Sequence, residues 1–85
     1  MAIRLRHVGT DPMSTNNGLP TVWVDEERRR VVAQGWIAGE EVRVACLATG
    51  PIPDHEQVVE LPESMMPFLA EVVDEWRRRG TLGGS

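Results

Sequence analysis

The feature that most constrains this chain is the stretch 20–37, PTVWVDEERRRVVAQGWI, in which two alternating segments flank a run of charges. Before the charged run, Val22 and Val24 alternate with Thr21, Trp23 and Asp25. After it, the segment VVAQGW at 31–36 continues with the same period of two. Alternation with period two, rich in β-branched and aromatic residues, is typical of β-strands. The charged run at 25–30 contains neither Gly nor Asn, which favours a four-residue loop built on a type I turn over a tight primed turn. The stretch therefore predicts a β-hairpin.

The register of this hairpin decides where its apolar side chains lie. If Asp25 pairs with Arg30, then Trp23 lies opposite Val32, and both strands carry apolar residues on both sides. One face then holds Val22, Val24, Val31 and Ala33. The other face holds Trp23, Val32 and Trp36. A solvated antiparallel sheet normally has one apolar face, so we expect another segment, a second subunit or a partner to cover the second one.

Size and charge exclude several classes of protein. The 85 residues, 41% of them hydrophobic, predict a single domain at 1–82 followed by a flexible tail at 83–85. So short a chain buries a modest fraction of its surface and often depends on oligomerisation. The net charge of −4 argues against direct nucleic-acid binding, which usually needs a basic face. No stretch resembles a signal peptide or a membrane span, so the expected compartment is the cytoplasm and no membrane partner is expected.

The remaining segments predict further strands. Alternation predicts an edge strand at residues 2–8, and QVVEL at 57–61 predicts a last strand. Residues 40–48, EEVRVACLA, fit either a strand or a short helix with glutamates in its first turn. The alternation of Val42, Val44 and Cys46 favours the strand.

The C-terminal third predicts an amphipathic helix. Its apolar residues recur at spacings of three and four: Met65, Phe68, Leu69, Val72, Val73 and Trp76. Pro67 must lie in the first turn, which makes Ser64 the expected N-cap and Met65 the first helical residue. Gly80 is an expected stop. The predicted fold class is thus α+β: a small antiparallel sheet of three to four strands with one C-terminal amphipathic helix packed on it.

The residues that could carry chemistry are few. His7, His55 and Cys46 show no CxxC, HxxxH or HExxH spacing, and no glycine-rich phosphate motif is present. We expect His55 to be a solvated loop residue and Cys46 a small buried apolar residue. No catalytic residue, cofactor or metal site is therefore predicted, and the chain is interpreted as non-enzymatic. The alternative is a small-ligand-binding protein or minor enzyme that uses Cys46 or His55.

The sequence is rich in residues that anchor protein interfaces. Three tryptophans, one phenylalanine and four methionines occur in a short chain, and aromatic residues and methionine are enriched in interface cores. Together with the two-faced hairpin, this predicts a protein-interaction module in which the arginine triplet sets orientation. The candidate partner contacts are Trp23, Val32, Trp36, Arg28, Arg29 and Arg30.

Four blocks carry a family resemblance: HVGTDP at 7–12, GLPTVW at 18–23, VVAQGW at 31–36 and QVVELP at 57–62. They resemble small acidic hypothetical proteins of filamentous high-GC Gram-positive bacteria, the BldB-like group, which are often encoded beside helix-turn-helix regulators. The resemblance implies an accessory protein that acts on a helix-turn-helix transcription regulator, as a homodimer. It carries over no catalytic residues.

Overall fold

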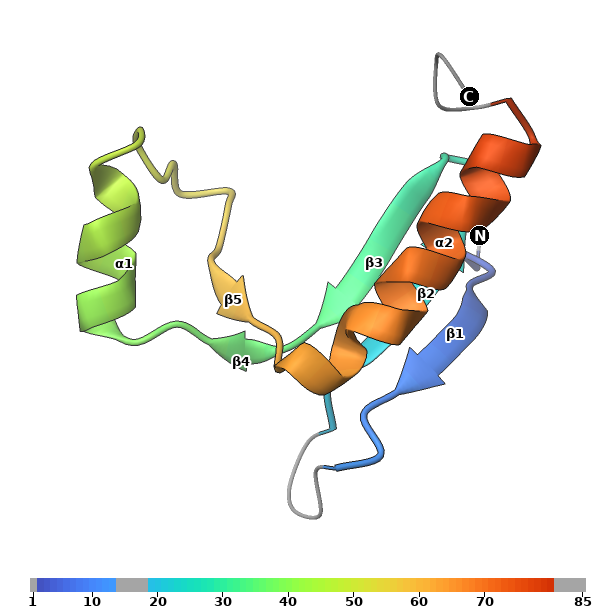
Figure 1. The fold of residues 1–85 in the computed structure, drawn as a ribbon. Helices are drawn as coiled ribbons and strands as arrows, with labels where there is room; N and C mark the ends of the chain where they lie inside the picture. Colours follow the sequence, from blue (N-terminus) through green and yellow to red (C-terminus); the bar gives the residue numbers. More distant parts are fainter. Residues whose placement is uncertain (1, 14–18, 81–85) are drawn as a thin grey trace.

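The computed structural model describes residues 2–13 and 19–80 and has an α+β fold, as predicted (Figure 1). Its elements in chain order are β1 (Arg6–Thr10), β2 (Thr21–Asp25), β3 (Arg30–Gln34), β4 (Trp36–Ile37), α1 (Glu40–Leu47), β5 (Val59–Glu60), the 3₁₀ turn η1 (Glu63–Met65) and α2 (Met66–Arg78). The tail predicted at 83–85 lies outside the described residues.

The main sheet has three antiparallel strands in the order β1-β2-β3. The predicted hairpin register is confirmed, because Asp25 pairs with Arg30 and Trp23 with Val32. The four-residue loop at 26–29 is also confirmed. Its last residue, Arg29, has a φ of 56°, in the left-handed region that residues with a Cβ seldom adopt.

Helix α2 packs on one face of this sheet, over β1 and β2, and the core lies between the helix and these strands (Figure 1). Val22 and Val24 of β2 are fully buried there, together with Met65 and Val72 from the helical segment. Partly buried residues complete the cluster: Val8, Leu61, Phe68, Leu69 and Trp76. The apolar stripe predicted for the C-terminal helix thus supplies most of the helical half of the core.

The start of that helix differs from the prediction. Ser64 was expected to cap α2, but it lies within η1 and α2 begins at Met66 without a side-chain cap. The Ser64 hydroxyl instead donates to the carboxylate of Asp11, with 2.6 Å between the oxygens. Asp11 is 3% exposed, so this bond satisfies a buried charge, which a helix cap would not do. Pro67 lies in the first turn and Gly80, with a φ of 72°, ends the helix, as predicted.

Two strands also differ in extent from their predictions. The edge strand expected at 2–8 is β1 at 6–10, because Arg6 already pairs with Val24 and the residues before Arg6 would face the hairpin turn. A bulge between His7 and Gly9 shifts the register of β1. The last strand expected at 57–61 is limited to β5 at 59–60, whose partner β4 is only two residues long.

Residues 36–60 form a projection that we call the arm (Figure 1). At its base β4 pairs with β5, and the N–H of Ala38 donates to the carbonyl of Val58 at 3.0 Å. Helix α1 lies beyond this base, away from the main sheet. The preference for a strand at 40–48 is therefore wrong. This segment lies away from every strand edge, so its backbone N–H and C=O groups form hydrogen bonds within a helix. Glu40 and Glu41 also suit the positive end of the helix dipole.

Candidate interaction surface

The main sheet has a second face, opposite α2, that we call the open face. Side chains alternate along β2, so Trp23 points away from the buried pair Val22 and Val24. Trp23 lies between His7 on β1 and Val32 on β3 in the sheet register. Among the described residues, no helix or second strand layer lies on this face (Figure 1). Trp23 and Val32 are accordingly only half-buried, and His7 is exposed.

Trp36 was predicted to share this face, but the structure places it in the other sheet. Strand β3 ends at Gln34, and Gly35 carries the chain into β4, where Trp36 pairs with Glu60. The carbonyl oxygen of Glu60 lies 2.5 Å from where a Cβ on Gly35 would be. This close approach of two backbones redirects the chain at Gly35, so the alternation of β3 does not extend to Trp36.

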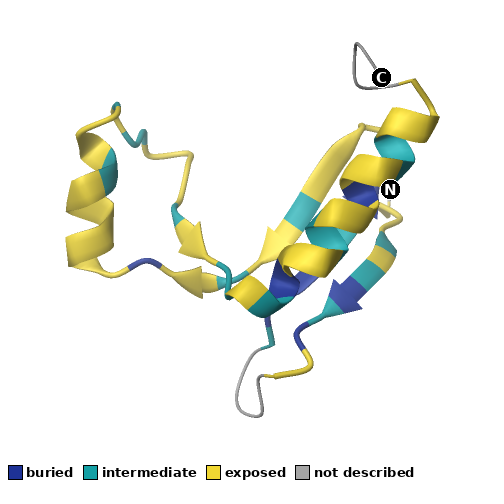
Figure 2. Cartoon of the chain, viewed as in Figure 1, coloured by how far each residue is buried: buried dark blue, intermediate teal, exposed yellow. Residues whose placement is uncertain are grey.

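The arm exposes most of its large apolar side chains (Figure 2). The exposed ones are Trp36 at 47%, Ile37 at 72%, Val42 at 38%, Val44 at 54%, Leu47 at 46% and Val59 at 40%. Helix α1 has no buried residue at all. An α-helix with apolar residues on several sides normally lies in a core or an interface. The arm therefore presents an apolar surface that this chain leaves largely uncovered.

The three arginines of the hairpin have different surroundings. Arg28 Nε lies 2.6 Å from Asp25 Oδ2, and the backbone N–H of Arg28 also donates to this carboxylate. These bonds hold the pKa of Asp25 below its ordinary value. Arg28 thus stabilises the turn. Arg30 is exposed beside Asp25 in the sheet register and is available to a partner.

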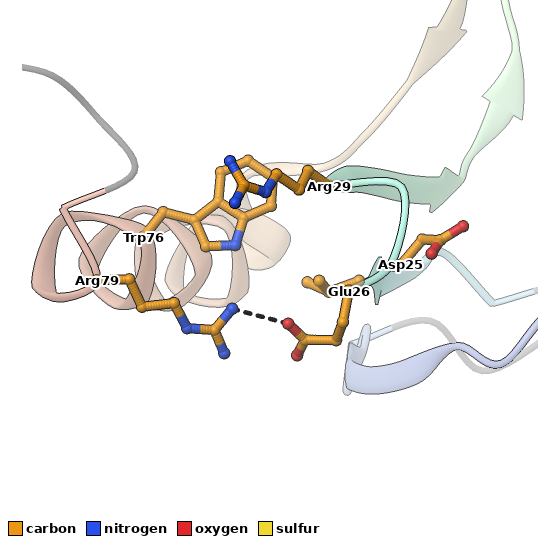
Figure 3. A pocket seen from close by; sticks show the side chains of 6 residues that line it. Asp25, Glu26, Arg29, Trp76 and Arg79 are labelled. Carbon is orange, nitrogen blue, oxygen red and sulfur yellow. Dashed lines mark hydrogen bonds and ion pairs between the residues drawn. The ribbon is translucent and has the colours of Figure 1, made fainter.

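Arg29 extends from the turn toward the indole of Trp76, and both line a pocket of about 250 Å³ (Figure 3). The remaining lining residues are Val24, Asp25, Glu26 and Arg79. The pocket lies between the hairpin turn and the C-terminal end of α2. Its lining does not include Cys46 or His55.

An ion-pair network joins the hairpin turn to α2, and sequence reasoning missed it. Glu26 accepts hydrogen bonds from Arg79 at 2.7 Å and from Arg6 at 2.8 Å, while Arg6 also donates to Glu75. The bond from Arg79, followed by that from Arg6, lowers the pKa of Glu26 from 4.5 to about 2. Glu75 and Arg79 are four residues apart, but Arg6 and Glu26 are distant from both in sequence. Only the packing of α2 on the sheet could therefore reveal the network.

The residues proposed for an alternative chemistry lie apart from this network. Cys46 is on α1 and is half-buried, so the expectation of a buried thiol is wrong. The cause is again the projection of α1 from the core. His55 has an 81% exposed side chain, as expected for a solvated loop residue. Within residues 2–13 and 19–80 there is no cluster of three or more metal-ligating side chains.

Fold and surface together define a small α+β protein: a three-stranded sheet covered by one helix, with an apolar arm and an open sheet face. Comparison of the chain with protein-family models, curated proteins and solved structures finds no significant match. None of the helices described here is both long and apolar enough to cross a membrane.

Proposed function

We propose that this protein is a non-enzymatic interaction module that acts by binding another protein through its apolar arm and open face. The observation that carries the proposal is the exposure of six large apolar side chains on an arm whose helix has no buried residue. A concentration of exposed apolar side chains on one projection is typical of interaction sites in folded proteins.

The energetics of association favour this use of the arm. A partner that covers Val44, Leu47 and Ile37 removes apolar surface from water, which is the main driving force of protein association. Exposed charges next to these residues, such as Arg30 and Glu41, would set the orientation of the partner and the rate of encounter. The arm needs no rearrangement to present these groups.

For the partner, we propose a helix-turn-helix transcription regulator, a second copy of this chain, or both. The family resemblance of the blocks at 7–12, 18–23 and 31–36 supports the regulator. The net charge of −4 suits a partner with a basic DNA-binding surface and makes direct contact with DNA by this chain unfavourable. The protein would therefore act on the regulator rather than on nucleic acid.

The test is an affinity experiment with a matched pair of variants. Val44→Glu places a charge on the exposed arm helix, and Val73→Glu makes the same change on α2, where Val73 is 39% exposed. Glu is at least as good a helix former as Val, so both variants should fold. Immobilised wild-type protein and Val73→Glu should retain a helix-turn-helix regulator from a lysate of the source cell, identified by mass spectrometry, and Val44→Glu should lose it. Equal retention by all three proteins would refute the role of the arm, and retention by none would refute the regulator as the partner.

A further inference from the structure

The chain has a larger surface than a compact protein of its mass. Its accessible surface is 6617 Å² for 9.5 kDa, whereas the scaling for compact monomers gives about 5,000 Å². Its radius of gyration is 14.7 Å, against about 12 Å for a compact domain of this length. The excess is about 1,600 Å² for one chain, about twice the 800 Å² that each partner buries in a standard protein–protein interface.

Two complementary surfaces contribute to this exposed area. Helix α1 has apolar side chains and no sheet to pack on, and the open face of the sheet has apolar side chains and no helix to cover it. The other face of the same sheet shows what such a surface accepts, because α2 packs there over Val22 and Val24. A helix on each face of a sheet is a standard layered architecture. Each molecule thus carries an uncovered apolar helix and an uncovered sheet face that do not contact each other within the same chain.

The charges of the two surfaces are also complementary. The first turn of α1 carries Glu40 and Glu41. At the open face, Arg30 on β3 is exposed beside Asp25, whose own charge is paired with Arg28. The acidic start of α1 is therefore complementary in charge to Arg30 at the β3 edge of the open face.

We propose that the occupant of the open face is the α1 helix of a second copy of this chain, so that two protomers exchange arms. Helix α1 of each protomer packs on the partner's Trp23 and the partner's Val32, with Glu40 and Glu41 directed toward the partner's Arg30. Because the same two surfaces meet twice, the arrangement closes with twofold symmetry and does not grow into a filament. The inference rests on the proposed function and deepens it by naming one partner.

The first test is the mass of the full chain in solution, measured by sedimentation equilibrium or light scattering at micromolar concentration. The wild type and the control Val73→Glu should have twice the monomer mass of 9.5 kDa, and Val44→Glu should have half the mass of the wild type. A monomeric wild type would overturn arm exchange. It would leave the proposed function open, because retention of the regulator is measured separately.

The second test uses Cys46, the single cysteine of the chain, to locate the arm. In the Val32→Cys variant, a short bis-maleimide should join Cys46 of one copy to position 32 of the other, and peptide mass spectrometry identifies the pair. The control Val73→Cys should give no link between positions 46 and 73. A dimer in which Cys46 links only to Cys46 would place two α1 helices side by side, and a dimer without any link to position 32 would leave the open face uncovered. Either result would overturn the proposed arrangement.

Discussion

The contact between Gly9 and Phe68 gives the sharpest prediction about stability. Gly9 is buried in β1, beneath the ring of Phe68 on α2. A Cβ added to Gly9 would lie 2.2 Å from Cδ1 of that ring, and two further ring atoms would lie within 2.5 Å. The ring would have to retreat by about 1.2 Å to reach the closest ordinary contact distance of 3.4 Å. The change Gly9→Ala therefore forces either the ring or the helix to move.

The magnitude follows from two opposing effects. Overpacking a core costs about 1–3 kcal/mol, and a clash with three ring atoms belongs at the upper end of that range. Replacing a glycine within a strand returns about 0.5–1 kcal/mol, because Ala loses less backbone entropy on folding. We therefore expect Gly9→Ala to lower the free energy of unfolding by about 2 kcal/mol. For a domain of this size, the midpoint of thermal unfolding falls by about 4–8 °C for each kcal/mol.

Urea unfolding followed by tryptophan fluorescence measures this loss, and two variants make the result specific. Gly50→Ala is the matched control, because an added Cβ there meets no atom within 4 Å, and it should change stability by less than about 1 kcal/mol. In a Phe68→Leu background the cost of Gly9→Ala should shrink by at least about 0.5 kcal/mol, the smallest coupling typical of contacting residues. A Gly9→Ala protein as stable as the wild type, or strict additivity with Phe68→Leu, would refute the reasoning.

Two further predictions concern the polar contacts. Glu26→Gln should be less stable than the wild type at neutral pH, and the difference should disappear as the pH falls from about 4.5 toward 2, because the low pKa of Glu26 stabilises the folded chain only above that range. Urea unfolding across this pH series measures the difference in stability, and a pH-independent difference would contradict the role of the ion pairs. Ser64→Ala should lower the free energy of unfolding by about 1.5–3 kcal/mol, because the buried carboxylate of Asp11 loses a hydrogen-bond donor. Ser64→Thr keeps the hydroxyl and should retain most of the stability. Equal stability of Ser64→Ala and the wild type would show that the bond contributes little.

Local patterns were sufficient to predict the hairpin and the C-terminal helix. In the hairpin, the run of charges and the alternation around it fix both the loop length and the pairing of Trp23 with Val32, because both depend on neighbours in the chain. In α2, the apolar stripe and Pro67 define the helix and its apolar face. The two-sided character of the hairpin also followed from sequence, since alternation alone assigns Trp23 to the face opposite Val22.

What the sequence could not predict depends on contacts between distant segments. Residues 40–48 form a helix because the arm carries them away from every strand edge, and nothing in EEVRVACLA specifies that location. Trp36 leaves the sheet because Gly35 meets the backbone of Glu60, which is distant in sequence. Ser64 donates a hydrogen bond to Asp11, which is 53 positions away in the sequence. In each case contacts between distant segments override the structure that the local sequence favours.

The base of the arm has a consequence for how this fold can change over time. Since β4 and β5 pair with each other, the two ends of the arm are held about 5 Å apart, the spacing of adjacent strands. No residue between Ala38 and Val58 belongs to the described core cluster. We therefore expect that this segment can be lengthened, shortened or rewritten without disturbing the packing around Val22 and Met65. Changes in the arm therefore leave the folding of the scaffold intact, and in the proposed arm exchange they are constrained only by the open face of the second copy.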